Sequence, residues 1–213
     1  MTNDYICPMY LIKTPWLLRA LYPQLIWNQP RSNRTLYLTF DDGPIPDVTP
    51  FVLDTLAHYN AKATFFCIGD NVHKHPDVFA RVKAGGHAIG NHTFNHLKGW
   101  ITEDSVYANN YKQADALLDT HLFRPPYGRI KRSQITLLQH TRPDIKIIMW
   151  DVLSGDFDTQ LNPDKCLRQT LKHTGNGAII VFHDSLKAFP RLKYVLPMAL
   201  EAWKNAGYEF RVL

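Results

Sequence analysis

The feature of this sequence that most restricts its fold is an alternation of short apolar runs with helical patterns, which begins at Thr35 and continues to the C-terminus. Apolar runs of strand length lie at residues 36–40, 63–68, 87–90, 122–123, 145–150, 177–182 and 208–212. Segments with helical periodicity lie between them, at residues 48–58, 77–84, 105–119, 133–139, 164–172 and 192–205. Strands that alternate with helices in this way are joined by right-handed crossovers into parallel sheets. The sequence therefore predicts an α/β protein, either an open doubly wound sheet or a barrel.

The end of the first predicted strand favours the barrel. This strand runs into Asp41-Asp42-Gly43-Pro44, whereas a dinucleotide-binding sheet has a glycine-rich phosphate loop at the same point. Two carboxylates would repel a phosphate group. The chain has 213 residues, of which 45% are hydrophobic, and this is sufficient for one domain with a well-buried core.

Residues 1–34 precede the alternating pattern and are predicted to form an N-terminal extension that packs on a domain of residues 35–213. Trp16, Tyr22 and Trp27 are the side chains that we expect to pack against that domain. The apolar run at residues 10–19 is interrupted by two cations and a proline, so it is too broken to cross a membrane. It also lacks the pattern of a cleaved signal peptide. The compartment stays open.

Charge and cysteine content exclude several classes of site. The net charge is +5, but the lysines and arginines are scattered and no basic-aromatic module is present, so we expect no nucleic-acid partner. Cys7, Cys67 and Cys166 are odd in number and too far apart for a zinc cluster. We therefore expect no disulfide framework and no thiolate metal site, with Cys67 as a core residue, in a monomeric protein.

Chemically active side chains follow the predicted strands at the ends where a barrel places its functional groups. Asp41 and Asp42 end the first strand, His92 and His96 follow the third, Arg124 follows the fourth, Asp156 follows the fifth, and His183 with Asp184 ends the sixth. Polar residues that serve only solubility would not concentrate in this way. We therefore expect these side chains to share one site.

A metal site is the first hypothesis for this cluster. His92 and His96 are four residues apart, a spacing that one helical turn brings to one side, although one could cap a helix while the other is exposed. Zinc bound by two histidines and one carboxylate keeps a position open for water, and Asp42 could supply that carboxylate. The expected cofactor is Zn²⁺ or another divalent ion such as Co²⁺. Such an ion lowers the pKa of its water toward about 7 and polarises a carbonyl oxygen.

The remaining groups have candidate roles in acid-base chemistry. Asp41 would act as general base, provided that a cation such as Arg124 keeps it ionised, although alone the acidic pair could be a solvated turn and Arg124 a surface residue. Two prolines after Arg124 stiffen the loop and leave the backbone N–H of Tyr127 to face an oxyanion. His183 could protonate a leaving amine, with Asp156 or Asp184 fixing its tautomer, or could be a hydrogen-bonded core residue.

These residues resemble the polysaccharide deacetylases, the NodB-homology domain of carbohydrate esterase family 4, and the likeness runs from about residue 35 to the C-terminus. Three family motifs are present without substitution, namely Thr-Phe-Asp-Asp-Gly at residues 39–43, His-Ser/Thr-x-x-His at residues 92–96 and Arg-Pro-Pro-Tyr at residues 124–127. The resemblance implies a distorted (β/α)7 barrel. It also implies hydrolysis of N-acetyl groups on a polymer that contains N-acetylglucosamine, such as peptidoglycan, a chitin-like glycan or an exopolysaccharide.

The roles that the resemblance implies coincide with those argued from the residues. Asp41 matches the general base, Arg124 the residue that orients it, His183 the general acid, Asp156 the support of that acid and Tyr127 the backbone donor; Asp42, His92 and His96 match the metal ligands.

Two elements depart from the family pattern. The element Asp-x-x-Asp-Trp has Leu153 in place of its first acid and Phe157 in place of its tryptophan, so the bracing of Arg124 would be absent or supplied by Asp151. Phe157 is still a hydrophobic wall. Ile180 replaces the leucine of Leu-x-x-His, a volume-conserving change in what would be the pocket for the acetyl methyl group. The substrate preference is the property that these changes affect.

The sequence thus predicts a metal-dependent N-deacetylase, with three alternatives. The first is an O-acetyl esterase that acts on a xylan-like glycan. The second is a glycosidase that uses Asp41 and Asp42 as its pair of carboxyl groups. These two groups would have to lie about 5 Å or more apart, on either side of the bond that is cleaved. This chemistry would leave the two histidines without a role. The third is a glycan-binding barrel without turnover.

Overall fold

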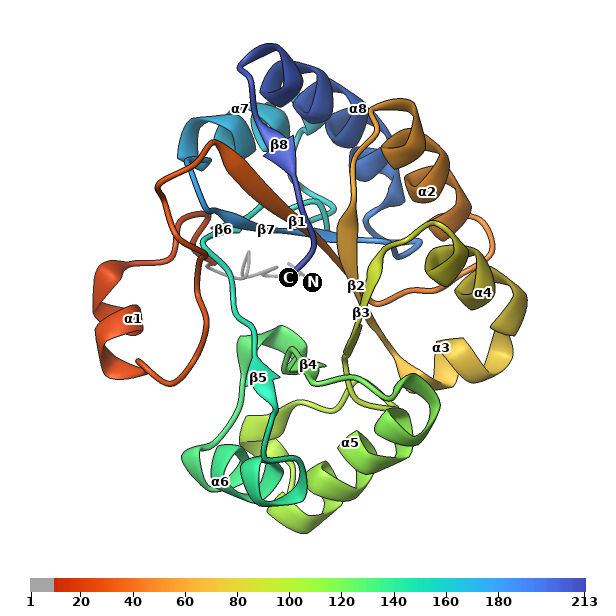
Figure 1. The fold of residues 1–213 in the computed structure, drawn as a ribbon, viewed down its shortest axis with the longest axis vertical. Coiled ribbons are helices and arrows are strands. Elements are labelled where there is room, and N and C mark those ends of the chain that lie inside the picture. The colour runs from red at the N-terminus through yellow and green to blue at the C-terminus, as the bar shows by residue number, and fades with distance from the viewer. Residues whose placement is uncertain (1–9) are drawn as a thin grey trace, which may run out of the picture.

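The computed structural model describes residues 10–213, in which parallel strands form a curved sheet with helices packed around its outside (Figure 1). The strands are β1 (Thr35–Asp41), β2 (Ala63–Cys67), β3 (Ala88–Asn91), β4 (Leu122–Phe123), β5 (Lys146–Ile147), β6 (Val152–Leu153), β7 (Ile179–His183) and β8 (Glu209–Phe210). Their order is β5-β4-β3-β2-β1-β7-β6, with β8 paired to β1, and all of these pairings are parallel. The sheet is a half-barrel, which confirms the predicted α/β class and agrees with a distorted (β/α)7 barrel.

Helices cover the outer face of this sheet, except for α1, which stands to one side (Figure 1). They are α1 (Trp16–Leu21), α2 (Thr49–His58), α3 (Gly69–Lys74), α4 (Pro76–Ala84), α5 (Asp104–Leu118), α6 (Arg132–Thr141), α7 (Pro163–His173) and α8 (Phe189–Asn205), with 3₁₀ turns η1 (Gly99–Ile101) and η2 (Pro126–Gly128). α7 begins at a signal that the sequence carries, because the Asn162 side chain accepts hydrogen bonds from two backbone N–H groups of the first turn and Pro163 follows it. Within residues 10–213, no helix is long and apolar enough to cross a bilayer.

The predicted elements were found near their expected places, with three omissions. The apolar run at residues 145–150 contains only the two-residue strand β5, and β6 was not predicted. Nor were α1 and α3, which have six residues each and are too short for a periodic pattern to show. Asp156 therefore follows the sixth strand and His183 ends the seventh.

Alternation along β1 separates the core from the site. Leu36, Leu38 and Phe40 are fully buried in a cluster shared with α2 and α8, and the Phe40 ring stacks with Phe65 at 5.1 Å. Because side chains on a strand alternate, Thr39 and Asp41 point to the opposite face, inside the barrel. The parallel strands end on one side, so the end of β1 delivers Asp41 to the same opening as the ends of β3, β4 and β7.

The N-terminal extension fills the gap between β5 and β6, which do not pair with each other. Lys13 bridges to Val152 on one side of this gap, and Ile26 bridges to Ile148 on the other. Trp27 is buried, and Tyr22 packs against the same cluster, as expected. Both edges of the half-barrel are thus covered by the extension. Cys7 lies outside the described residues, whereas Cys67 and Cys166 are free thiols buried in the core.

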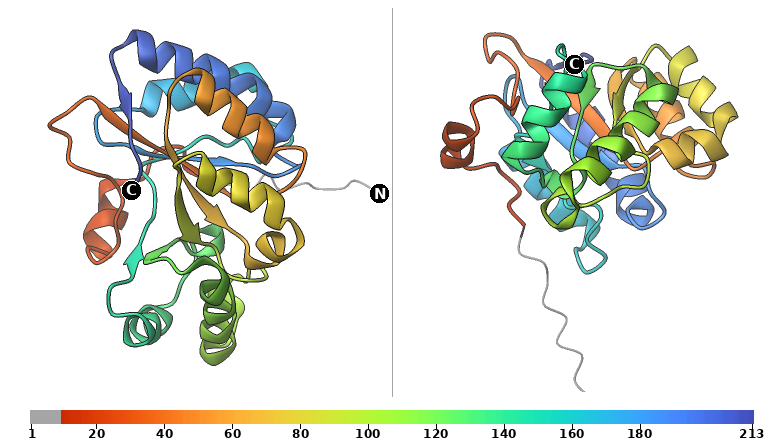
Figure 2. Two further views of the ribbon diagram at one scale, coloured as in Figure 1. Left: turned by 45° about the vertical axis from the view of Figure 1, so that its right-hand side comes forward. Right: turned by 90° about the horizontal axis from the view of Figure 1, so that it is seen from below.

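The expectation for Trp16 was wrong. This side chain is 77% exposed on α1, which stands apart from the other helices and has no buried residue (Figure 2). The helix carries Leu17 and Leu21 exposed to solvent, while its charged residue, Arg19, turns inward. The side of α1 that faces the barrel makes an electrostatic contact, because Arg19 binds a carboxylate there. The Trp16 ring lies on another side of the helix and does not pack against the core.

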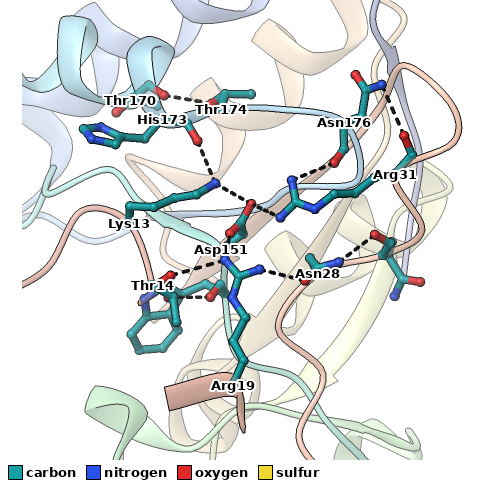
Figure 3. Close-up of polar contacts among 12 residues, drawn as sticks. Lys13, Thr14, Arg19, Asn28, Arg31, Asp151, Thr170, His173, Thr174 and Asn176 are labelled. Atoms are coloured by element: carbon teal, nitrogen blue, oxygen red, sulfur yellow. Dashed lines mark hydrogen bonds and ion pairs between the residues drawn. The ribbon is translucent and has the colours of Figure 1, made fainter. Parts of the chain in front are cut away.

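That carboxylate is Asp151, which lies between β5 and β6 and is completely buried (Figure 3). It forms ion pairs with three cations of the extension: Lys13 at 2.7 Å, Arg31 at 3.0 Å, and Arg19. Lys13 also donates to the His173 carbonyl. One buried carboxylate therefore ties three points of the extension to the barrel.

We predict that Asp151→Asn lowers the free energy of unfolding by about 3 kcal/mol, because the isosteric amide leaves three cations around a site without negative charge. The matched control is Asp54→Asn. Asp54 pairs with Arg81 on the surface, with side chains 74% and 53% exposed, and its loss should cost less than about 1 kcal/mol. Urea unfolding of the two variants measures both values, and equal losses would contradict the structural role of Asp151.

Candidate active site

The two adjacent acids face different partners because the strand ends between them. Asp41 is the last residue of β1, and Asp42 adopts a positive φ of 87°. Asn71 donates to the Asp42 carbonyl at 2.7 Å, and the Gly43 N–H donates to the Asp184 carboxylate at 2.9 Å. A Cβ atom on Gly43 would overlap this carboxylate, so only glycine fits. The break in the pleat that the sequence predicted at Gly43 is therefore present.

Arg124 holds Asp41. Its guanidinium is completely buried and donates to the Asp41 carboxylate and to the Thr39 hydroxyl, both at 2.7 Å. The other donors reach the backbone carbonyls of Ile148 at 3.2 Å and Met149 at 3.0 Å. The cation also lies 4.1 Å above the Phe66 ring. A buried charge with so many partners has one orientation, and it fixes the carboxylate beside it.

Of the two alternatives for the bracing of Arg124, absent or supplied by Asp151, the second is wrong, because Asp151 binds the extension. Leu153, which stands where the family has an acid, is a buried apolar side chain. Backbone carbonyls and the Thr39 hydroxyl brace Arg124 in its place.

The histidine pair is brought together by a loop. The predicted helical turn was wrong, since His92 and His96 lie in an irregular segment after β3, in which Thr93 and His96 have positive φ angles of 62° and 57°. Side chains replace the hydrogen bonds of a helix here, because Asn91 accepts from Thr93 N–H and Asn110 accepts from the next two N–H groups. The two imidazole rings still lie together, with centroids 5.0 Å apart.

Asp42, His92 and His96 fit a divalent metal ion. Nε2 of His96 lies 3.3 Å and Nε2 of His92 lies 4.0 Å from the Asp42 carboxylate, and all three ligand atoms lie within 4.8 Å of one another. Nδ1 of His92 is 2.7 Å from the Arg124 carbonyl, so Nδ1 carries the proton and Nε2 is free to coordinate. Burial, followed by the charge of His96, lowers the pKa of His92 well below its usual value and keeps this imidazole neutral. Two neutral imidazoles and one carboxylate are the donor set of catalytic zinc sites.

Asp156 holds His183 on the other side of the opening. One carboxylate oxygen lies 2.8 Å from Nδ1 of His183, and the other accepts its backbone N–H at 2.8 Å. Burial lowers the pKa of His183, but the nearby carboxylates, first Asp156 and then Asp42 and Asp41, outweigh it and raise this pKa to about 9, so the imidazole is protonated at neutral pH. Asp184, the other candidate partner, instead binds Thr49 and Gly43.

Three residues were predicted to contact the substrate, namely Tyr127, Phe157 and Ile180. The rings of the first two lie next to histidines of the site. The Tyr127 ring lies 4.6 Å from His96 and is 60% exposed, and the Phe157 ring lies 5.0 Å from His183. The structure does not bring Ile180 to the site. Ile180 is completely buried in the core between the sheet and the helices, because alternation along β7 turns it away from the face that carries His183.

Comparison with known proteins assigns this arrangement to a family. The family profile described as polysaccharide deacetylase matches residues 28–142. A peptidoglycan-N-acetylglucosamine deacetylase of Bacillus cereus is 31% identical over 191 residues, which cover 86% of this chain and 88% of that protein. This chain belongs to the polysaccharide deacetylase family. It is therefore a hydrolase of the amide deacetylase class. This finding rules out the alternative of a glycosidase that uses Asp41 and Asp42.

Two further relatives of this deacetylase support the assignment. A chitooligosaccharide deacetylase of Azorhizobium caulinodans is 31% identical over 164 residues, which cover 72% of this chain and 75% of that protein. A crystal structure of a peptidoglycan N-acetylglucosamine deacetylase has a TM-score of 0.85 at 28% identity and covers 94% of this chain and 95% of that chain. Deacetylases of this family are metal-dependent, and Asp42, His92 and His96 form the candidate metal site here.

The contacts of two residues in this deacetylase's site were not predicted from the sequence. Thr39 accepts a hydrogen bond from Arg124 and donates one to the Ile180 carbonyl at 2.8 Å. Its position two residues before Asp41 on a strand places both on one face, and this was the available signal. Asp184 shapes the turn at Gly43, and burial, the leading cause, raises the pKa of its carboxyl group to about 8. Asp184 was expected at this site as a candidate partner of His183, but no local pattern predicts its contact with Gly43, 141 residues away.

We predict that His183 of the metal-free protein titrates with a pKa of about 9 by NMR, and that Asp156→Asn lowers this value. The pKa in the folded state lies above the unfolded value of about 6.5, so the pair stabilises the fold fully below about pH 6.5. This contribution is lost as the pH rises through about 9. An unchanged His183 pKa in the variant would contradict the role of Asp156.

Proposed function

We propose that the enzyme removes N-acetyl groups from a glycan that contains N-acetylglucosamine, with Asp41 as general base and His183 as general acid. The observation that carries this proposal is that the site holds one proton acceptor and one proton donor, each fixed by its own buried partner. Asp41 is a carboxylate that accepts from a buried guanidinium, whereas His183 is an imidazolium held by Asp156. A proton acceptor and a proton donor therefore lie beside one candidate metal site, as amide hydrolysis needs.

The proposed cofactor is Zn²⁺ or another divalent ion such as Co²⁺, held by Asp42, His92 and His96. When bound, such an ion makes a water more acidic and polarises the acetyl carbonyl. Asp41 then takes a proton from the water that attacks the acetyl carbon, and Arg124 keeps its carboxylate in place. The backbone N–H of Tyr127 donates to the oxygen on which negative charge develops. His183 gives its proton to the sugar nitrogen as the C–N bond breaks, so that acetate and a free amine leave.

The names of the relatives support an N-acetylglucosamine glycan as substrate, and we propose peptidoglycan, a chitin-like chain or an exopolysaccharide. In this proposal residues 35–213 form the catalytic domain and Phe157 forms a hydrophobic wall beside the reacting group. Residues 1–34 are the N-terminal extension, of which the described part, residues 10–34, covers the gap in the barrel. We expect a monomer.

We predict that Asp41→Asn and His183→Ala each lower acetate release from acetylated chito-oligosaccharides by about 10²- to 10⁴-fold, the range for loss of a general base or acid. Both variants should keep their bound metal. His140→Ala and Asp54→Asn are surface controls of the same chemistry and should retain full activity. Wild-type activity in either active-site variant would overturn its role. Acetate release from acetylated xylan alone would favour the O-acetyl esterase.

We predict one equivalent of divalent metal per chain after incubation with zinc, measured by elemental analysis of the desalted protein. His96→Ala should lose most of this metal, because it removes one of three ligands. His140→Ala, in which an exposed histidine is removed, should keep it. A chelator should abolish acetate release and added zinc should restore it. A wild-type protein that binds no metal would defeat the proposed mechanism.

A further inference from the structure

Large apolar side chains are exposed beside the candidate active site. Trp100 is 57% exposed and Ile101 79% exposed on η1, which follows the loop of His92 and His96. Tyr127, on the neighbouring loop, is 60% exposed. Exposed apolar patches of this kind mark places where another molecule binds. The proposed mechanism uses the backbone of Tyr127 and leaves Trp100 without a role.

The indole of Trp100 is held in one position although it is exposed. Its Nε1 donates to the Ile130 carbonyl at 3.3 Å, and the Arg129 guanidinium lies 4.8 Å from its ring centroid. The backbone of η1 packs closely on this segment, because a Cβ atom on Gly99 would overlap the Arg129 carbonyl. A ring that is fixed before binding loses little conformational entropy when a ligand packs on it.

Trp100 and Arg129 are connected to the reacting centre. Arg129 follows Tyr127 by two residues, and the Tyr127 ring packs on the metal-ligand candidate His96 at 4.6 Å. Gly128 lies between them with a positive φ of 64° and contacts Trp150 so closely that a side chain would overlap it. Trp100, Arg129 and Tyr127 therefore form a rim. Tyr127 contacts the candidate metal ligand His96, Arg129 follows it closely in sequence, and Trp100 contacts Arg129.

The chemistry of this rim suits a sugar ring. A pyranose presents a face of C–H groups that packs on an aromatic ring, and its hydroxyl and acetamido oxygens accept hydrogen bonds from a guanidinium. Trp100 supplies the ring, and Arg129, which is half-buried, supplies the donors. The guanidinium lies over one face of the indole, so a saccharide unit that packs on the exposed part of the ring has a hydrogen-bond donor next to it.

We propose that Trp100 and Arg129 form a subsite for a sugar unit further along the glycan than the one that loses its acetyl group. This inference rests on the proposed function and deepens it, because it assigns two residues outside the reacting centre to the recognition of the saccharide chain.

The test is Trp100→Ala, measured with tetra-N-acetylchitotetraose and with 4-nitrophenyl acetate, which carries no sugar. The KM for the tetrasaccharide should rise about tenfold, equivalent to about 1.4 kcal/mol of binding, with kcat changed less than about twofold. The preference for tetrasaccharide over nitrophenyl acetate, as the ratio of kcat/KM values, should fall about tenfold. Trp100→Phe should restore most of it, and Arg129→Gln should lower it in the same direction.

The matched control is Trp16→Ala, which removes the other strongly exposed tryptophan, 77% exposed on α1, and should leave both substrates unaffected. An unchanged KM for the tetrasaccharide in both Trp100→Ala and Arg129→Gln would overturn the subsite while the proposed function stands. Equal losses on both substrates would show that Trp100 supports the fold or the reacting centre, and would also overturn it. A wild-type enzyme that releases no acetate from the tetrasaccharide would defeat the proposed function, and the subsite with it.

Discussion

The buried guanidinium of Arg124 is the constraint on which the site depends. A charge that is removed from water must be fully paired, and Arg124 meets this requirement with hydrogen-bond acceptors from two parts of the chain, residues 39–41 and residues 148–149. Its guanidinium orients the Asp41 carboxylate, while its own backbone carbonyl fixes the tautomer of His92. One residue therefore positions the proposed base and one proposed metal ligand together, so the geometry of the two functions cannot vary independently.

The carbonyls that hold Arg124 belong to a segment that the N-terminal extension holds from the other side. Ile26 forms a bridge with Ile148, and its carbonyl accepts the N–H of Met149 at 2.7 Å. Two residues further on, Asp151 is tied to three cations of the same extension. In the family pattern an acid stands at the position of Leu153, and in this chain backbone geometry has taken over the support of the arginine. The extension therefore contacts the same segment that binds Arg124 in the active site.

Much of this arrangement follows from the sequence, because parallel strands deliver their carboxyl ends to one opening. The proximity of Asp42 to both histidines, and of Asp156 to His183, could be predicted on that basis. The helical turn at His92 could not be corrected from sequence, since the positive φ angles there depend on the side chain of Asn110 from a distant helix. The exposure of Trp16 was also hidden, because it depends on Arg19 reaching a carboxylate 132 residues away. Ile180 was misplaced because a motif gives spacing but does not state which face of a strand a residue occupies.

Residues 13–31 of the extension close the gap in the barrel, and this has a consequence for the order of folding. The extension emerges from the ribosome before the barrel, yet the hydrogen bond from Lys13 to Asp151 spans 138 residues and that from Lys13 to the His173 carbonyl spans 160. Contacts of such long range are closed late, because the entropy of a large loop must be overcome first. The nascent chain therefore carries the exposed leucines of α1 without their anchor until the segment that contains Asp151 has been synthesised. The same segment supplies two acceptors of Arg124, the carbonyls of Ile148 and Met149, so the extension and the proposed base are held in place by one late part of the chain.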